Sequence, residues 1–318
     1  MTDRGTPRHL PLGPGQEFDA IRELLAHWGN RAAGIGDDAA ILHVPRGDAL
    51  VVSVDTAIDE QHFRRDWLTA REIGYRAVTA ALSDIAAMAA RPLGTLVALA
   101  LPNEQRTSLG DLADGVGDAL DAAETGILGG NVSSGGQLSL TTTVLGTAFA
   151  PLRRDGLCPG DLLYVTGRLG GPGAAVAAWQ RGSEPQPEHR VRFAHPTARL
   201  RPARWLADRG ATAAIDISDG FAADAEHLAL ASGVGIDVDL ALLPVLSGVA
   251  DVLEAAASGE EYELLVGARV GLDTADFERT FDLPLTAVGR ATVLDDGILF
   301  RRGNERVAKP SGYDHLSR

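Results

Sequence analysis

Lysine and cysteine are nearly absent from this sequence, and each absence removes a class of function. Lys309 is the single lysine among 318 residues, so there is no Gly-Lys-Ser/Thr sequence and hence no P-loop. No lysine stands where a strand of a protein kinase requires one. If the protein uses ATP, it must hold the phosphates in another way. Cys158 is the single cysteine, which excludes an internal disulfide or a cysteine-based zinc site and fits a reducing cytoplasm.

Long apolar runs and excess positive charge are also missing. The longest apolar run, residues 93–101, is far shorter than the roughly 20 residues that a membrane-spanning helix needs. The N-terminal residues lack the apolar core of a secretory signal. The formal net charge of −14 argues against a broad surface for nucleic acid or anionic membranes, because such partners require clustered positive charge. We therefore expect a cytoplasmic protein that binds neither nucleic acid nor membrane.

Helix and strand patterns are mixed along the whole chain, which predicts two α+β domains, residues 1–150 and 151–318. The polar, turn-rich residues 151–156 mark the boundary. The glycine-rich residues 167–173 do not fit a dinucleotide-binding pattern and predict a turn from strand to helix. The other expected helices cover 17–28, 69–90, 108–124, 198–208 and 221–231, and the expected strands cover 49–54, 93–101, 138–148, 162–166, 213–217, 235–240, 262–266 and 285–290.

Aspartates embedded in apolar sequence are the most informative feature, because aspartate is unfavourable inside helices and strands. The run Gly34–Asp38 places paired carboxylates before a strand, and either a capped turn or a metal site explains it. Ser53 and Asp55 face the same way at the end of the next strand, since side chains alternate along a strand. A strand end capped by aspartate is common, so this second pattern alone decides nothing.

Two further carboxylates are harder to explain by capping. Asp84 lies on an otherwise apolar helix face, where a carboxylate is costly unless a cation or hydrogen bonds compensate; a helix break with an N-cap at Ser83 or Asp84 is the alternative. Asp216 stands between two isoleucines, and capping explains Ser218 or Asp219 but not Asp216. Mg²⁺ takes oxygen ligands, and no EF-hand loop is present. These aspartates therefore predict several Mg²⁺ ions around a polyphosphate.

The order of these motifs resembles the thiamine-monophosphate kinase family, of the aminoimidazole ribonucleotide synthetase superfamily. Each motif is modest, but their order and completeness from about residue 34 to the C-terminus make the resemblance specific. The matching pieces are residues 34–38, 53–56, 62–63, 82–88, 129–130, 159–161, 215–220, 260–264 and 312–315.

The resemblance implies a fold, a reaction and partners. The fold is two α/β-mixed domains: an N-terminal domain that binds ATP and magnesium and whose sheet forms a barrel in a homodimer, with ATP near the dimer interface, and a C-terminal α+β domain that completes the ATP and substrate site. The reaction is direct, in-line transfer from ATP to thiamine monophosphate, giving ADP and thiamine diphosphate with several Mg²⁺ ions. A requirement for K⁺ is left open.

The resemblance also implies roles for single positions, all of them ligands rather than catalytic acids or bases. Asn131 stands where the family usually has an aspartate, and we assign it to both metal and ATP. Val54 is placed to offer a main-chain oxygen to a metal. The implied magnesium ligands are Asp38, Ser53, Val54, Asp55, Asp84, Asn131, Asp216 and Asp219; the ATP contacts are Gly130, Asn131, Arg154 and Ser218; the contacts to thiamine phosphate are His62, Glu260 and Tyr313.

Two departures from the family pattern keep alternatives open. Asn131 offers one neutral oxygen where aspartate offers a carboxylate, so one magnesium site should be weaker or completed by water. Glu60 replaces a usual glycine just before His62, which puts the fit around the substrate in question. By itself, His62 could also be a general base or a structural histidine. The rival hypotheses are another ATP-using enzyme of the superfamily with a different acceptor, and a catalytically impaired nucleotide-binding homologue.

Overall fold

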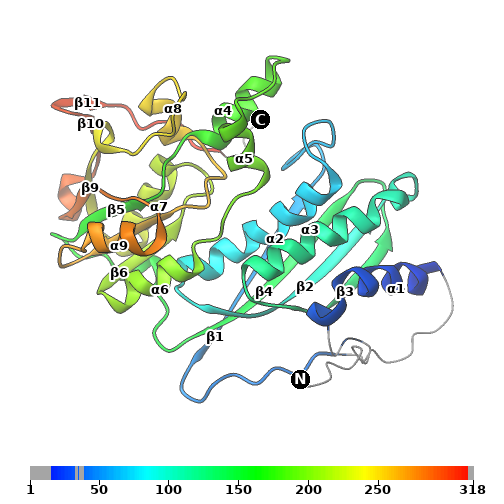
Figure 1. Ribbon diagram of the computed structural model, residues 1–318. Helices are drawn as coiled ribbons and strands as arrows, with labels where there is room; N and C mark the ends of the chain where they lie inside the picture. The colour runs from blue at the N-terminus through cyan, green and yellow to red at the C-terminus, as the bar shows by residue number, and fades with distance from the viewer. Residues whose placement is uncertain (1–15, 33–34, 36–38, 314–318) are drawn as a thin grey trace. The chain divides into compact units, whose positions relative to one another are not determined.

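The chain divides into two compact units in a computed structural model that describes residues 16–32, 35 and 39–313. The first unit comprises the chain up to Ile85 together with Arg91–Phe149. The second comprises Ala86–Ala90 and the chain from Ala150 onward. Each unit has its own sheet, so each is described by itself (Figure 1).

The first unit is built on a four-stranded sheet with the strand order β1-β4-β2-β3. Strands β2 and β3 are parallel, whereas β1 pairs antiparallel with β4 and β4 with β2. Helix α1 packs against α3 and β3, and the Trp28 indole N–H donates to the main-chain oxygen of Ala113 at 3.0 Å. The elements are α1 Gln16–Trp28, β1 Ala49–Ile58, α2 Ala70–Ala87, β2 Arg91–Leu101, α3 Leu109–Ala122, β3 Ile127–Ser134 and β4 Ser139–Ala148, with short 3-10 helices at Gly29–Ala32 and Asn103–Ser108.

The two faces of this sheet differ in burial. In β4, Leu140, Thr142 and Val144 are fully buried, while the residues between them are half-buried. This alternation follows from the two-residue period of a strand and marks the face that helices cover. On the opposite face of the edge strand β1, Val52 and Val54 remain 55% and 61% exposed. The first unit therefore presents apolar side chains on an uncovered sheet face.

The second unit is built on a seven-stranded mixed sheet with the strand order β11-β10-β7-β9-β5-β8-β6. Its core collects the apolar residues of β5, β6 and β8 with those of α7, including the fully buried Phe221 and Leu228. The elements are β5 Leu162–Thr166, α4 Gly171–Gln180, α5 Pro187–Ala194, α6 Leu200–Asp208, β6 Ala211–Asp216, α7 Phe221–Ser232, β7 Gly235–Asp239, α8 Val252–Ala257, β8 Leu264–Ala268, α9 Thr274–Phe281, β9 Leu285–Thr292, β10 Ile298–Arg302 and β11 Glu305–Val307, with 3-10 helices at Arg154–Gly156, Leu240–Leu242 and Leu294–Asp296.

The mixed α+β class predicted from the sequence is confirmed, and the strand at Leu162–Thr166 has the predicted bounds. Strand β3 was not predicted, because its Gly129-Gly130-Asn131 centre has low strand propensity and it depends on pairing with β2. The short helices α5, α8 and α9 were missed as well; α5 carries few apolar residues, so no helical stripe stands out. The barrel formed across a dimer stays a prediction.

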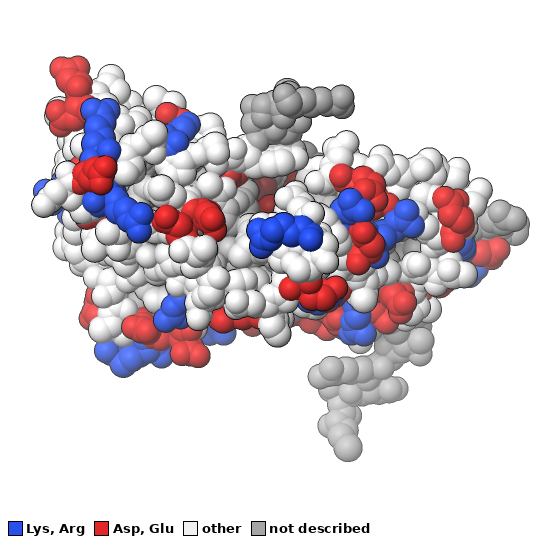
Figure 2. Space-filling model, turned by 90° about the horizontal axis from the view of Figure 1, so that it is seen from above, with Lys and Arg blue, Asp and Glu red and all other residues white. Residues whose placement is uncertain are grey.

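Two surface properties bear on the expected partners. Among the helices that the structure describes, none combines the length and the apolar character needed to cross a membrane. On the face shown in Figure 2, the described acidic and basic side chains are interspersed, and the basic ones do not form one continuous surface.

Candidate functional site

The run Gly34–Asp38, which includes the predicted magnesium ligand Asp38, lies outside the described residues except for Ile35. The other predicted site residues are all described, and they fall into both units. His62, Asn131 and the ligands on β1 and α2 belong to the first unit; Arg154, Ser218, Glu260 and Tyr313 belong to the second.

Ser53 and Asp84 meet in the first unit although 31 positions separate them. The Ser53 hydroxyl on β1 donates to Asp84 Oδ2 on α2 at 2.5 Å. Asp55 lies two residues further along β1 on the same face, and its Oδ1 accepts the Thr56 N–H at 2.7 Å. The register puts Asp55 opposite the buried Thr142 of β4, on the helix-covered face. Asp84 is only half-buried, so this carboxylate is less desolvated than its apolar helix face suggested.

Asn131 lies on the other face of the same sheet. Its register partner in β2 is Ala98, which pairs with Thr141 of β4, whereas Asp55 is in line with Thr142 and Val97. Side chains that are register partners point to the same face, so Asn131 and Asp55 point to opposite faces and are separated by two intervening strands. Within one copy of the unit, the structure therefore does not bring Asn131 together with Ser53, Asp55 and Asp84.

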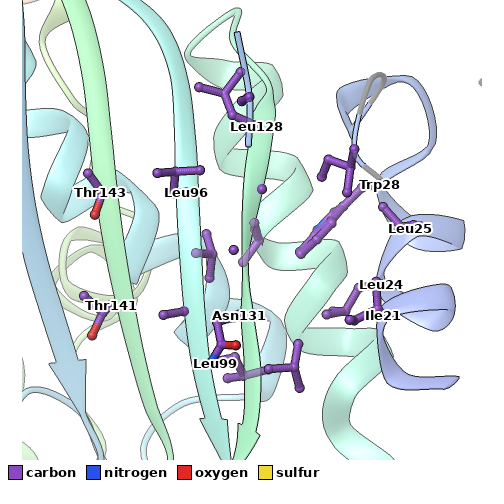
Figure 3. A pocket seen from close by; sticks show the side chains of 18 of the residues that line it. Ile21, Leu24, Leu25, Trp28, Leu96, Leu99, Leu128, Asn131, Thr141 and Thr143 are labelled. Atoms are coloured by element: carbon purple, nitrogen blue, oxygen red, sulfur yellow. The ribbon is translucent and has the colours of Figure 1, made fainter. Parts of the chain in front are cut away.

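The packing of β3 against β2 requires glycine at position 130. A Cβ atom at this position would come within 1.9 Å of the Val97 main-chain oxygen, so no side chain fits there. The adjacent Gly129-Gly130-Asn131 segment also lines a cavity of about 830 Å³. Figure 3 shows the α1 side chains of the cavity facing β3, where Asn131 lies. The walls are largely apolar and include Ile21, Leu24, Leu25 and Trp28 of α1, and Leu112 and Val116 of α3.

His62 follows β1 in a tight turn that also contains Glu60. The Ile58 N–H donates to His62 Nδ1 at 3.1 Å, so the ring proton of the neutral imidazole is on Nε2. Glu60 has φ +64°, a left-handed conformation that glycine adopts without cost. This conformation supplies a physical reason for the glycine that the family commonly has there.

In the second unit, β6 ends at the buried Asp216, and a turn of residues 217–220 leads into α7. The N–H groups of Ser218, Asp219 and Gly220 all donate to Asp224 Oδ2, at 3.0, 3.1 and 3.2 Å. Burial first, and then the neighbouring Asp216 and Asp219 carboxylates, raise the pKa of Asp224 to about 8. Asp224 was not among the residues predicted from the sequence. The signal for it was an acidic residue in the first turn of a helix that follows an Asp-Gly turn.

Two predicted substrate residues meet this turn through the main chain. The Glu260 N–H donates to the Ser218 oxygen at 2.7 Å, and the Tyr313 N–H donates to the Asp219 oxygen at 2.8 Å. Gly312 passes so close that a Cβ atom there would lie 2.8 Å from the Asp219 oxygen. The Tyr313 side chain is half-exposed. Segments distant in sequence thus converge on the Ser218-Asp219 turn.

Arg154 lies in a 3-10 helix that packs against β6 and α7. Its side chain is exposed, while its main-chain oxygen accepts the Ser232 hydroxyl at 2.6 Å. Next to it, the Ala214 N–H of β6 donates to the Arg153 oxygen at 3.2 Å. The backbone around Arg154 is therefore attached to the strand that ends at Asp216.

Two groups of oxygen ligands suit a hard cation: one on β1 and α2 of the first unit, and one in the turn after β6 of the second. Each offers carboxylate and hydroxyl oxygens, and the acidic turn of the second unit concentrates Asp216, Asp219 and Asp224, whose mutual repulsion a cation would relieve. Within the part of the chain that the structure describes, no group of three or more His, Cys, Asp or Glu side chains is arranged to hold a metal by itself.

Comparisons with known proteins identify the family. The domain family described as AIR synthase related protein, N-terminal domain, matches residues 36–148, and its C-terminal counterpart matches residues 158–300. The chain is 34% identical over 305 residues to the thiamine-monophosphate kinase of Escherichia coli (strain K12), covering 89% of this chain and 92% of that protein.

Solved structures are similar over nearly the full length. The thiamine-monophosphate kinase of Stenotrophomonas maltophilia K279a has a TM-score of 0.78 and 31% identity, covering 94% of this chain and 99% of that one. AaThiL, solved in complex with AMPPCP and TMP, has a TM-score of 0.75 and 25% identity, covering 94% and 96%. Motif order, fold and similarity over both domains lead to one conclusion: the chain belongs to the thiamine-monophosphate kinase family, among the AIR synthase related proteins.

Proposed function

We propose that this protein transfers the γ-phosphoryl group of ATP to thiamine monophosphate, which yields thiamine diphosphate and ADP. The observation that carries the proposal is the convergence on one turn. Ser218 and Asp219, which match nucleotide and metal contacts of the family, are hydrogen-bonded to the main chain of Glu260 and Tyr313, which match substrate contacts. Membership of the family supports the reaction, and the convergence supports a part for the Ser218-Asp219 turn in it.

The acceptor makes a general base unnecessary. A phosphate monoester is already anionic near neutral pH, because its second pKa is about 6. The difficulty is to bring two anions together in line, which requires positioning and charge neutralisation. Of this chain's residues, His62 fits a positioning role, since the proton on Nε2 lets it donate a hydrogen bond to an anionic oxygen. We therefore assign His62 to substrate binding and propose direct transfer without a phosphoenzyme.

Magnesium is part of the proposal. When bound, Mg²⁺ would neutralise phosphate charge and hold the phosphates in a reactive orientation. The residues that would hold it are those predicted from the sequence: Asp38, Ser53, Val54, Asp55, Asp84, Asn131, Asp216 and Asp219. The Ser53–Asp84 hydrogen bond and the Asp224-organised turn support two of these groups. Among the ligands that the structure describes, Asn131 has the weakest support, because it points away from the β1 ligands.

The cavity of the first unit is our candidate for the base of ATP. Gly130 and Asn131, which match ATP contacts of the family, line it, and its volume of about 830 Å³ lies within the range of small-molecule sites. A flat aromatic base suits walls that are mainly Leu, Val and Ala and that include Trp28. Arg154 and Ser218 are the ATP contacts that we assign to the second unit.

We also propose that the protein is a homodimer and that it works in the cytoplasm. Leu50, Val52 and Val54 are 49%, 55% and 61% exposed on one face of the edge strand β1. Such contiguous apolar exposure is typical of a covered interface, and a second copy matches the barrel implied by the family.

Val54→Asp should convert the dimer to a monomer in sedimentation experiments, whereas Val270→Asp, at another exposed valine, should not. Unchanged sedimentation of Val54→Asp would contradict this interface.

One assay tests the proposed reaction. Purified protein is incubated with ATP, Mg²⁺ and thiamine monophosphate, with and without K⁺, and both ADP and thiamine diphosphate are quantified by chromatography. We expect equal amounts of the two products and no comparable turnover with other phosphate acceptors. Production of ADP with a different acceptor only would support the rival enzyme of the superfamily. A chemically competent ³²P-labelled protein would refute direct transfer.

The impaired-homologue alternative needs its own control. Wild type and Asn131→Asp are compared over a range of Mg²⁺ concentrations. We expect both to turn over, with the variant needing less Mg²⁺, because a carboxylate replaces a neutral amide oxygen. If both bind ATP and neither forms thiamine diphosphate, the proposed function fails.

A further inference from the structure

Residues 258–263, called the substrate loop below because they include the predicted substrate contact Glu260, have a strained main chain. Glu260 and Tyr262 have φ of +60° and +52°, and neither is a glycine. A left-handed conformation costs an ordinary residue free energy and persists only where the surroundings impose it. Here it occurs twice within three residues, next to Ser218. The loop must therefore be held in place by contacts that outweigh this strain.

Buried side chains supply those contacts. Glu261 and Glu263 are buried on either side of Tyr262, although both are carboxylates. Glu261 Oε1 accepts the Gly170 N–H at 2.5 Å and the Ser258 hydroxyl at 2.6 Å. Glu263 Oε2 accepts the Thr166 hydroxyl at 2.7 Å. These bonds attach the loop to β5 and to the start of α4.

Arg192 of α5 connects the two halves of the loop. Its Nη2 donates to the Glu261 main-chain oxygen at 3.1 Å, lies 3.4 Å from Glu261 Oε2 and lies 3.0 Å from Glu263 Oε1. One guanidinium group therefore holds the chain on both sides of the strained Tyr262. Arg199 pairs with Glu263, with its Nε 2.8 Å from Oε2. Of the two arginines, only Arg192 reaches the peptide group that joins Glu261 to Tyr262.

We propose that Arg192 is a positioning residue for the phosphorylated acceptor: by holding Glu261 and Glu263, it keeps the Glu260–Tyr262 backbone in the strained conformation that presents Glu260 to substrate. The inference rests on the proposed function of Glu260 as a substrate contact. It assigns to α5, a helix that no sequence motif marked, an indirect role in acceptor binding. Arg192 itself need not touch substrate or the reacting atoms.

The chain offers a matched control for this role. Arg301 also binds two carboxylates and one main-chain oxygen: its Nε lies 2.7 Å from Asp237, and its Nη1 lies 3.0 Å from both Asp239 and the Gly303 oxygen. It belongs to the same unit, but the residues that it holds are in none of the predicted site segments. Arg192→Met and Arg301→Met therefore remove the same kinds of contact, although Arg301 and its carboxylate partners are more exposed. Only the first substitution affects the substrate loop.

The first test separates positioning from general damage. With thiamine monophosphate as acceptor, Arg192→Met should raise KM for the acceptor on the order of tenfold, because relaxation of about one strained residue reduces the competent loop population by that factor. KM for ATP should stay within about twofold, and Arg192→Lys should recover part of the loss. Arg301→Met should leave both KM values unchanged. An unchanged acceptor KM in folded Arg192→Met, or an equal rise in both KM values, would overturn the proposal.

A second measurement does not depend on activity. Hydrogen exchange at the amides of Glu260 and Tyr262 should accelerate in Arg192→Met and not in Arg301→Met, without any substrate. If Arg192→Met does not fold, Ser258→Ala, which removes one bond to Glu261, serves in both experiments. Accelerated exchange in an enzyme that does not use thiamine monophosphate would refute the proposed function and leave the loop support intact. Unchanged exchange would refute the role of Arg192 whatever the substrate.

Discussion

Replacing Asp224 tests whether one buried carboxylate organises the Ser218-Asp219 turn. Asp224 Oδ2 is the common acceptor of three consecutive main-chain N–H groups, and the side chain is almost completely buried. Asp224→Ala removes the acceptor and leaves three donors without it. Asp224→Asn keeps a carbonyl oxygen of nearly the same shape in place. The two variants therefore separate the hydrogen bonds from the carboxyl group itself.

The expected loss follows from the number of bonds. A hydrogen bond contributes about 1 kcal/mol net to the free energy of unfolding, so Asp224→Ala should lose about 3 kcal/mol. Asp224→Asn should lose less than about 1 kcal/mol, because its oxygen can still accept. The turn carries Ser218 and Asp219, so Asp224→Ala should also weaken activity at subsaturating ATP.

Two measurements examine this prediction. Urea unfolding compares the free energies of the three proteins, and hydrogen exchange followed by mass spectrometry reports on the amides of residues 218–220. Exchange at these amides should be faster in Asp224→Ala and close to wild type in Asp224→Asn. The reasoning is refuted if Asp224→Ala is as stable as wild type with unchanged exchange, or if both variants lose equal stability.

Three further predictions address other parts of the two units. Burial raises the pKa of Glu261 to about 7, so its contribution to the free energy of unfolding is present below about pH 4.5 and is lost as pH rises through 7. Urea unfolding of Glu261→Gln at several pH values should lack this pH-dependent contribution. If the free energy of unfolding of the variant changes with pH in parallel with that of wild type, the prediction is wrong. Ser53→Ala removes the hydroxyl that orients Asp84, so half-maximal activity should require about tenfold more Mg²⁺, the usual scale of such losses; an identical Mg²⁺ titration would exclude this role. Glu60→Gly should change stability by less than about 1 kcal/mol in thermal unfolding, since relief of the positive φ offsets the greater entropy of the unfolded chain. Glu60→Val should destabilise the protein by more than about 1 kcal/mol, because a branched side chain is unfavourable at positive φ. Equal effects of the two substitutions would contradict the strain at Glu60.

Sequence patterns predicted a helix or strand correctly where a run of apolar residues is buried and bounded by turn residues. The strand before the glycine-rich turn and the helix after Asp219-Gly220 follow from apolar runs bounded by turn residues. The same patterns did not predict β3, since Gly129, Gly130 and Asn131 form a strand only because β2 pairs with them. Propensity describes a residue by itself, whereas strand pairing depends on the neighbouring chain.

Candidate ligands show the same division. The sequence pattern singled out Ser53 and Asp84, and the structure places the Ser53 hydroxyl 2.5 Å from Asp84 Oδ2. Their role as magnesium ligands stays a prediction. No pattern indicated that Asn131 points to the opposite sheet face, because the face is decided by the register of four strands. Asp224 was missed for a related reason. Its role consists of accepting bonds from a turn that exists only once β6 and α7 are formed.

The sequence by itself determined the kinds of groups available to this protein: abundant carboxylates, a single lysine and no P-loop, in an order shared by one enzyme family. Which of these groups act together was decided by the tertiary structure. Three sets of contacts join positions far apart in the chain. They are the hydrogen bond between Ser53 and Asp84, the hydrogen bonds of Glu260 and Tyr313 to Ser218 and Asp219, and the contacts of Arg192 with the strained loop. Such contacts depend on strand register and helix packing, which arise from the whole chain and from no single motif.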